Sequence, residues 1–471
     1  MTRTPADSPT SPDNPGSDPT STPVETVEDA VAHPSVHAAD VLTKPRIRLW
    51  TPILTHSVTD FLSFVTVALM PLLAVRLEMS IEQKALLLSL GALASGGIQP
   101  LVAWINDKFD SRMTGPIGLA TAAICVGLLG YAQTYPQLLI LFFFGIAGVG
   151  AFHPAAAAST GQLAGRRRSA MLSVFFLFGM IGGVLGNVLS PQYVNAMGAL
   201  SGEAGTAATD AGLKALVWLI PPGLISAGVL LWAIRRVPHR NHAAHDDHIN
   251  LSKAEKTRRW IAFWILYAGN VIRFTTNQML VYLMIEWTER LVRTEAGVAT
   301  MTESLGQRAS EFNGPLQGSM QVGMGFGALA LGFFLPAKYE KKAFVLIPLI
   351  GAGTMLAIPH ADALLPTSAF AAATVAGLLT IVAGFGFGSL VPVSMSLGQR
   401  LLPHRTSFAS GMMLGGAWGV AVIGPQIMRA IHKGIDTNLE LGFAVTAGTI
   451  ALASVLAIWL PGRLLREIAP H

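Results

Sequence analysis

Long apolar runs separated by short polar stretches fill the chain from residue 50 onward. Each run approaches or exceeds the roughly 20 residues that a helix needs to cross the hydrocarbon core of a bilayer. Backbone groups in lipid must be paired within the segment, so runs of this length predict helices. The pattern predicts twelve spans, at 50–75, 82–105, 114–134, 137–160, 169–192, 213–234, 259–285, 313–336, 343–360, 366–393, 407–430 and 441–461.

Composition narrows the class of protein. Of 471 residues, 51% are hydrophobic and 13% charged, against about 25% charged in soluble domains. The single cysteine, Cys125, excludes an intrachain disulfide and a cysteine metal cluster. There is no GxxxxGK[ST] loop for nucleotide binding, and the basic loops do not show the stacked-aromatic pattern of nucleic-acid binders. We therefore expect an all-α multi-pass membrane protein in a lipid bilayer, with no enzymatic activity, no cofactor and no nucleic-acid partner.

The basic residues alternate from loop to loop. If both termini are cytoplasmic, 23 of the 32 lysines and arginines lie in cytoplasmic segments, 8 lie on the other side, and Arg273 lies inside a helix. This is the bias of the positive-inside rule, and an odd number of spans would break it midway. Charge therefore supports twelve spans with cytoplasmic termini.

The chain divides into two halves that echo one another. GIAGVGAFHPAAAASTGQ (145–162) resembles GFGFGSLVPVSMSLGQ (384–399), and each ends the fourth helix of its half. A repeat with the same orientation predicts two pseudo-symmetric six-helix bundles with a site between them. We expect a monomer in which a disordered cytoplasmic tail precedes the first bundle, a cytoplasmic linker joins the bundles, and a short tail follows. The predicted boundaries are 1–44, 45–236, 237–257, 258–466 and 467–471.

Five motifs, in order along the expected helices, resemble the major facilitator superfamily, and within it the fosmidomycin-resistance-type exporters. The resemblance covers roughly residues 50–465 and implies a secondary transporter of alternating access in a bacterial-type inner (plasma) membrane. The motifs are THSVTD (55–60), GGIQPLVAWINDKFDSR (96–112), FHPAAAA (152–158), VIRF (271–274) and QRLLPHRTSFASGM (399–412).

The resemblance also implies a cytoplasmic gate at the loop after the second helix. Asp107, Lys108 and Arg112 remain from the superfamily's loop signature, and Arg405 lies at the start of the eleventh helix. In the second half, Pro336 stands at the aspartate position of the corresponding loop. The segment 286–312, between the seventh and eighth spans, is longer than the family usually has, and we expect it to form an external cap.

Asp60 and His56 are four residues apart in the first span, so a helix places them on one face. Ionisable groups deep in a membrane helix mark functional sites by default. A carboxylate in low dielectric holds a proton more readily than one in water, and histidine titrates near neutral pH. We expect Asp60 to carry a coupling proton with help from His56. The alternative is a structural polar pair that a neighbouring helix neutralises.

Arg273 lies in the seventh span, with Asn270 and Asn277 on its face. An arginine keeps its proton, so it needs an anion in a cavity. We expect that anion to be Asp60, another carboxylate or the substrate, and a permanent structural ion pair is the alternative.

Further polar side chains are candidate substrate ligands. Gln317 and Gln321 share a face of the eighth span, Gln99 lies in the second, and His153 lies near the cytoplasmic end of the fourth. Such stripes also serve as hydrogen bonds between helices.

The linker contains HRNHAAHDDH (239–248), in which His239, His242, His245 and His248 are weak candidate metal ligands. Imidazole suits nickel, cobalt and zinc, but no partner shell is evident around this stretch.

These observations favour proton-coupled export of a small organic compound, drug-like or anionic, with protons and the bilayer as the other partners. Three alternatives stay open: a proton-independent facilitator or importer of a metabolite, a transport-dead receptor or scaffold, and a metal-ion exporter that uses the histidine-rich loop.

Overall fold

The computed structural model describes residues 44–109, 112–164, 168–237, 252–364, 368–402, 406–434 and 438–468. Across these ranges the secondary structure is helical, without strands. Apolar runs of this length in a chain with few charges leave the helix as the conformation that pairs its own backbone groups.

The helices of the first half follow the expected spans closely. The first span is a bent pair of helices that turn by 48° at Leu69, where Pro71 opens the second member. The elements are α3 (Pro45–Ala68), α4 (Met70–Arg76), α5 (Ile81–Phe109), α6 (Thr114–Gly127), α7 (Tyr135–Ala164), α8 (Arg168–Leu200), α9 (Thr206–Lys214) and α10 (Ile220–Ile234).

The second half contains more breaks. The expected tenth span is divided into two helices, and a π-helical turn at Met412–Gly416 interrupts the eleventh. The elements are α11 (Lys253–Ala296), α12 (Glu303–Phe334), α13 (Glu340–Ala357), α14 (Ala361–Leu364), α15 (Ala369–Gly388), α16 (Val391–Leu401), α17 (Thr406–Gly411), α18 (Ala417–Val420), α19 (Ile423–Gly434), α20 (Leu439–Ile458) and α21 (Gly462–Glu467).

Nine helical segments of the described residues are long and apolar enough to cross a membrane, or ten when the bent pair α3–α4 counts as one span. Helices α11 and α12 coincide with the expected seventh and eighth spans but fall outside that count. Polar side chains such as Asn270, Asn277, Gln317 and Gln321 are spread along them. The number twelve therefore stays a prediction.

The segment 286–312, expected to form an external cap, consists of the ends of two helices and the turn between them. Helix α11 continues to Ala296, where Gly297 ends it with a φ of 66°. Helix α12 begins at Glu303 after the side chain of Thr302 accepts a hydrogen bond from the backbone of Leu305. Both helices simply extend, because local capping signals place the turn between residues 297 and 302.

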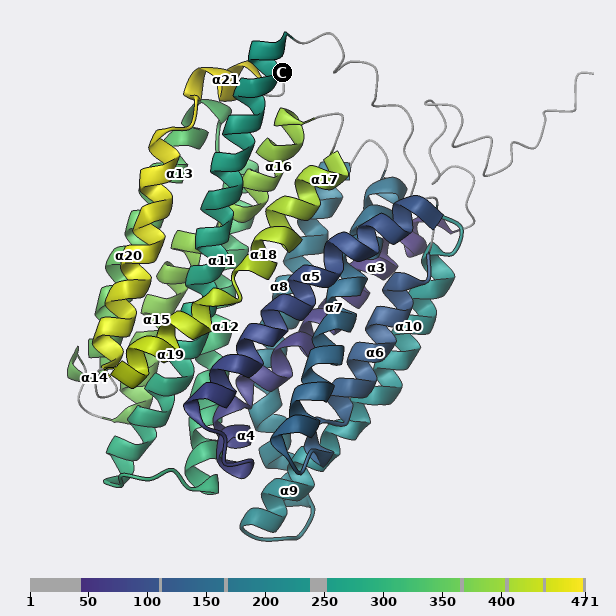
Figure 1. Ribbon diagram of the computed structural model, residues 1–471. Helices are drawn as coiled ribbons and strands as arrows, with labels where there is room; N and C mark the ends of the chain where they lie inside the picture. Colours follow the sequence, from purple (N-terminus) through teal and green to yellow (C-terminus); the bar gives the residue numbers. More distant parts are fainter. Residues whose placement is uncertain are drawn as a thin grey trace, which may run out of the picture.

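The helices pack into two groups, shown in Figure 1 as the purple-to-teal helices α3–α10 on one side and the teal-to-yellow helices α11–α21 on the other. Within the first group α3 packs against α7, α8 and α10; within the second α12 and α13 pack against α15. The two groups meet chiefly where α8 and α4 contact α12, and where α5 contacts α18 and α19.

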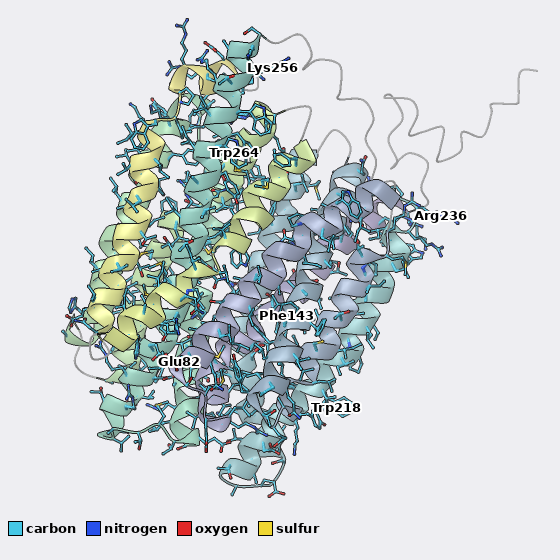
Figure 2. All side chains as sticks on the ribbon, in the orientation of Figure 1. Glu82, Phe143, Trp218, Arg236, Lys256 and Trp264 are labelled. Atoms are coloured by element: carbon cyan, nitrogen blue, oxygen red, sulfur yellow. The ribbon has the colours of Figure 1, made fainter. Side chains whose placement is uncertain are left out.

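The molecule has two distinguishable ends. Arg236 and Lys256 lie at one end and Trp218 lies towards the other (Figure 2). We call these the basic end and the opposite end.

Candidate functional site

Asp60 and His56 form a buried pair on one face of α3. The Nε2 atom of His56 lies 3.3 Å from Oδ2 of Asp60. His56 is 1% exposed and Asp60 is 6% exposed. The expected pairing along the helix is therefore present, and it is shielded from bulk solvent.

A second histidine, His153 of α7, completes the cluster. Its Nε2 atom lies 3.3 Å from Oδ1 of Asp60, so the two carboxylate oxygens face two different imidazoles. The rings of His56 and His153 meet edge to face, with centroids 5.0 Å apart. We call His56, Asp60 and His153 the His–Asp–His cluster.

The other ring nitrogen of each histidine faces a backbone carbonyl. Nδ1 of His56 lies 2.7 Å from the oxygen of Phe175, and Nδ1 of His153 lies 2.8 Å from the oxygen of Val149. A carbonyl only accepts, so each Nδ1 must carry a hydrogen and donate it. In a neutral imidazole each Nε2 is then an acceptor directed at Asp60. The cluster needs protons between its acceptors to be stable.

Helix α8 closes the cluster from one side. The ring of Phe175 stacks on His56 with centroids 3.9 Å apart. A Cβ atom on Gly179 would lie 2.4 Å from Cε1 of His56 and 2.6 Å from Oδ2 of Asp60. The absence of a side chain at 179 is thus what lets α8 approach the pair so closely.

The three side chains also have the donor types of a transition-metal site, and their ligand atoms lie within 4.8 Å of one another. Protons shared between the Nε2 atoms and the carboxylate satisfy the same atoms without an ion.

A central cavity of about 170 Å³ lies beside the cluster, between the two helix groups. Its polar lining combines the cluster with Ser63, Ser95, Gln99, Asn277 and Gln321. The structure therefore brings four of the expected substrate ligands, Gln99, His153, Asn277 and Gln321, to one cavity.

An outer cavity of about 470 Å³ continues from the central one. It extends along α8, α12 and α16 towards Leu172, Glu340 and Gln399, which lie near the helix ends at the basic end. The residues shared by both linings are Phe176, Met180, Ala328, Pro392 and Met395.

At the opposite end, ion pairs and a hydrogen bond join the two groups. Nζ of Lys84 on α5 lies 2.5 Å from Oε1 of Glu286 and 3.1 Å from Oε2 of Glu289, both on α11. The side chain of Asn313 on α12 donates to the carbonyl of Val67 at 2.7 Å. These contacts hold the two groups together at this end.

Arg273 lies outside both cavity linings. It is 1% exposed, donates from Nη1 to Oδ1 of Asn270 at 3.3 Å, and stacks over the ring of Phe344 at 5.0 Å. The expected Asp60–Arg273 pair does not form in this structure, because Asp60 faces the two histidines and Arg273 points into the second helix group.

Two more expected ligands take part in packing. Asn270 donates to Oγ of Ser394 at 2.7 Å and to the carbonyl of Met413 at 2.9 Å. Gln317 donates to the carbonyl of Val281 at 3.1 Å, which joins α12 to α11. Neither lines a cavity.

Of the expected gate residues, only Arg112 has a described side chain. Its Nε atom donates to the carbonyl of Val237 at 2.9 Å, within the first helix group. The side chains of Asp107 and Lys108, and the whole of Arg405, lie outside the described residues. So do the metal-ligand candidates His239, His242, His245 and His248.

A sequence model described as the Major Facilitator Superfamily matches residues 53–425. The chain belongs to this superfamily. Family and fold are those of transporters rather than enzymes, and the protein is a multi-pass membrane protein. The resemblance noted from the motifs is confirmed.

One sequence relative and two similar structures support the assignment to this superfamily. The fosmidomycin resistance protein of Escherichia coli (strain K12) is 23% identical over 410 residues, covering 87% of this chain and 91% of that protein. A bacterial homologue of the human drug peptide transporters PepT1 and PepT2 has a similar structure, with a TM-score of 0.63, 14% identity, and coverage of 91% and 100%. A bacterial homologue of the human lysosomal transporter Spinster gives a TM-score of 0.60 at 15% identity, with the same coverage.

Sequence reasoning placed His153 among substrate ligands but missed its contact with Asp60, and it missed Lys84 and Glu289. The spacing of Glu286 and Glu289 puts them on one helix face, which was the available signal. Nothing in the sequence pairs them with Lys84, because that contact depends on how α5 and α11 meet.

Proposed function

We propose that this chain is a proton-coupled exporter of a small organic compound. It works by alternating access, with twelve spans in a bacterial-type plasma membrane and both termini in the cytoplasm. The observation that supports this function best is the His–Asp–His cluster, in which Asp60 lies between two histidines whose Nδ1 atoms are already committed to carbonyls.

The number of protons bound to the cluster determines how many of its two Nε2–carboxylate contacts contain a hydrogen. With Asp60 ionised and both imidazoles neutral, two Nε2 lone pairs would face carboxylate oxygens without a hydrogen between them. One added proton satisfies one of the two contacts, and two added protons satisfy both. We infer that the cluster exchanges up to two protons with water that reaches it through the cavity.

Proton binding and substrate binding are coupled because both take place at the central cavity. Asp60 and His153 line the same central cavity as Gln99, Asn277 and Gln321. A bound substrate therefore displaces water beside the cluster and changes the free energy of its charged states. Binding of the substrate therefore changes the affinity of the cluster for protons, and bound protons change the affinity for the substrate. Coupled exchange across a membrane requires such a mutual effect.

The arrangement of the contacts supports alternating access. If the basic end faces the cytoplasm, as the positive-inside rule indicates, the cavity opens inward and the Lys84–Glu286–Glu289 contact closes the outside. Export fits the name of the fosmidomycin resistance protein, a relative whose length this chain covers almost fully.

Infrared difference spectroscopy tests the proton site without a known substrate. The spectrum of purified protein at acid minus alkaline pH should contain a carboxylate band of Asp60 that shifts as protons enter its contacts with the two histidines, and Asp60→Asn should remove that band. Glu340→Gln, at a carboxylate paired with Arg400 away from the cluster, serves as the control and should leave that band in place. A band that remains in Asp60→Asn would contradict the assignment of Asp60 to the proton site.

Transport is tested in everted vesicles with fosmidomycin and a panel of uncharged aromatic amides. Native protein should acidify or alkalinise the lumen when a transported compound is added, and Asp60→Asn should not. Substrate uptake that does not change with an imposed pH gradient would instead indicate a proton-independent facilitator.

A further inference from the structure

The walls of the central cavity are rich in methionine and aromatic side chains. Unbranched, polarisable methionine side chains adapt to apolar ligands of different shape. Apolar walls with a few convergent polar groups are typical of small-molecule sites. These wall residues are Met180, Met320, Met324, Met395, Phe64, Phe176, Phe274 and Trp418.

Outside the His–Asp–His cluster, the linings offer no free charge for an ionic substrate. No lysine or arginine lines either cavity in the part of the chain that the structure describes. The two lining carboxylates are already paired, Asp60 with the two histidines and Glu340 with Arg400 at 2.5 Å. A buried ion without a partner of opposite charge is strongly disfavoured, so these walls favour an uncharged molecule.

Gln321 provides a buried amide in this wall that has no hydrogen-bond partner. Its side chain is 3% exposed, lines the central cavity, and has no hydrogen-bond partner for Oε1 or Nε2. Gly183 of α8 makes the space for it, since a Cβ atom there would lie 2.2 Å from Oε1. Leaving both a buried donor and a buried acceptor unpaired is costly, and a ligand that supplies both would relieve the cost.

We propose that Gln321 orients the substrate, and that the substrate is an uncharged, mainly apolar small molecule carrying an adjacent hydrogen-bond donor and acceptor, as a carboxamide or lactam does. The primary amide of Gln321 and such a group pair in two antiparallel hydrogen bonds. The apolar body then lies against the methionine and aromatic side chains. This proposal rests on the transport function and deepens it by assigning the substrate class.

Calorimetric titration at one fixed pH with four naphthalene probes tests the proposal. The probes are 2-naphthamide, methyl 2-naphthoate (acceptor only), 2-naphthoate (anion) and 2-naphthylmethylamine (cation). Native protein should bind the amide about tenfold more tightly than the ester, the effect of one hydrogen bond and its unpaired partner. The two charged probes should bind more weakly than the amide.

Gln321→Leu should bring the amide-to-ester ratio close to one while keeping affinity for the ester, which shows that the variant is folded. Gly183→Ala, which displaces the same amide, should reduce the ratio as well. Gln426→Leu is the matched control, because Gln426 bonds to Ser89 and lines neither cavity; it should leave the ratio unchanged.

Equal binding of amide and ester to native protein, a ratio that survives in Gln321→Leu, tightest binding of a charged probe, or no binding of any probe would each overturn the proposal. These titrations involve no proton movement. They can therefore fail while the Asp60 infrared band behaves as expected, and the reverse is equally detectable.

Discussion

His153 Nε2 lies 3.3 Å from Asp60 Oδ1, so a histidine of α7 shares the carboxylate that His56 of α3 contacts from the other side. The two histidines differ in their surroundings. Both line the central cavity, but His56 is 1% exposed and stacks on Phe175, whereas the side chain of His153 is 18% exposed. We therefore expect His153 to contribute mainly to proton exchange, and His56 to contribute to both proton exchange and stability.

We predict that His153→Gln reduces proton uptake with little loss of stability. Glutamine can still donate to Asp60 but does not titrate, so uptake between about pH 8 and pH 5 should fall by about one proton per protein. His56→Gln should also lower the thermal midpoint, because it removes a buried ring and its bond to Phe175. Dye-monitored proton uptake and thermal unfolding measure the two effects; equal uptake in native protein and His153→Gln would contradict the two-histidine site.

Gly179→Ala should disable the cluster from a helix that contributes no titratable group to it. The added methyl group would meet His56 and Asp60 at 2.4–2.6 Å, and overpacking of this kind costs about 1–3 kcal/mol. We expect a lower thermal midpoint and a weakened infrared band. Gly228→Ala on α10, where a Cβ meets nothing within 4 Å, should be neutral or slightly stabilising; a similar loss in both variants would indicate a general effect of alanine.

Lys84→Met should open the opposite end. Removing the lysine leaves Glu286 and Glu289 as like charges, each 8% exposed, and breaking a buried ion pair costs about 3–5 kcal/mol. That energy applies to the state in which α5 meets α11, so the population should shift towards the outward-open state.

The shift can be measured at Ser310, which is 1% exposed on α12 and accepts a hydrogen bond from the backbone of Leu72. A Ser310→Cys reporter in a Cys125→Ser background should react faster with an impermeant maleimide after Lys84→Met. Lys338→Met, at an exposed position near the basic end, is the charge-matched control. Unchanged labelling would show that the ion pair does not hold this end closed.

Arg273→Met should leave proton exchange and probe binding intact. The guanidinium is buried without a carboxylate within 4.0 Å among the described residues and lies outside both cavities. Replacing such a charge by an apolar side chain of similar length is commonly tolerated. Loss of probe binding would restore Arg273 as a substrate ligand.

Arg48→Met provides the contrast. Arg48 is 2% exposed, but its Nη1 donates to the carbonyls of Trp232 and Ala233 at 2.9 and 2.8 Å. Removing it should lower the thermal midpoint, since two carbonyls at the end of α10 lose their donor and each charged hydrogen bond contributes about 1.5–3 kcal/mol.

The sequence by itself determined the features that depend on local spacing. Apolar run lengths predicted the helices, because lipid leaves the backbone no other partner, and the four-residue spacing of His56 and Asp60 predicted their contact along α3. The order of the motifs predicted the superfamily. These outcomes need no knowledge of how one helix is rotated against the next.

Only the tertiary structure decided which polar faces meet. Gln317 and Gln321 lie one turn apart on α12, yet the first bonds to α11 and the second faces the cavity. His153 contacts Asp60, whereas Arg273 packs on Phe344 within the second group. Lys84 of the first group forms an ion pair with Glu286 of the second. Helix rotation is set by close packing of small residues such as Gly179 and Gly183 against neighbours distant in the chain. Periodicity within one helix does not contain that information.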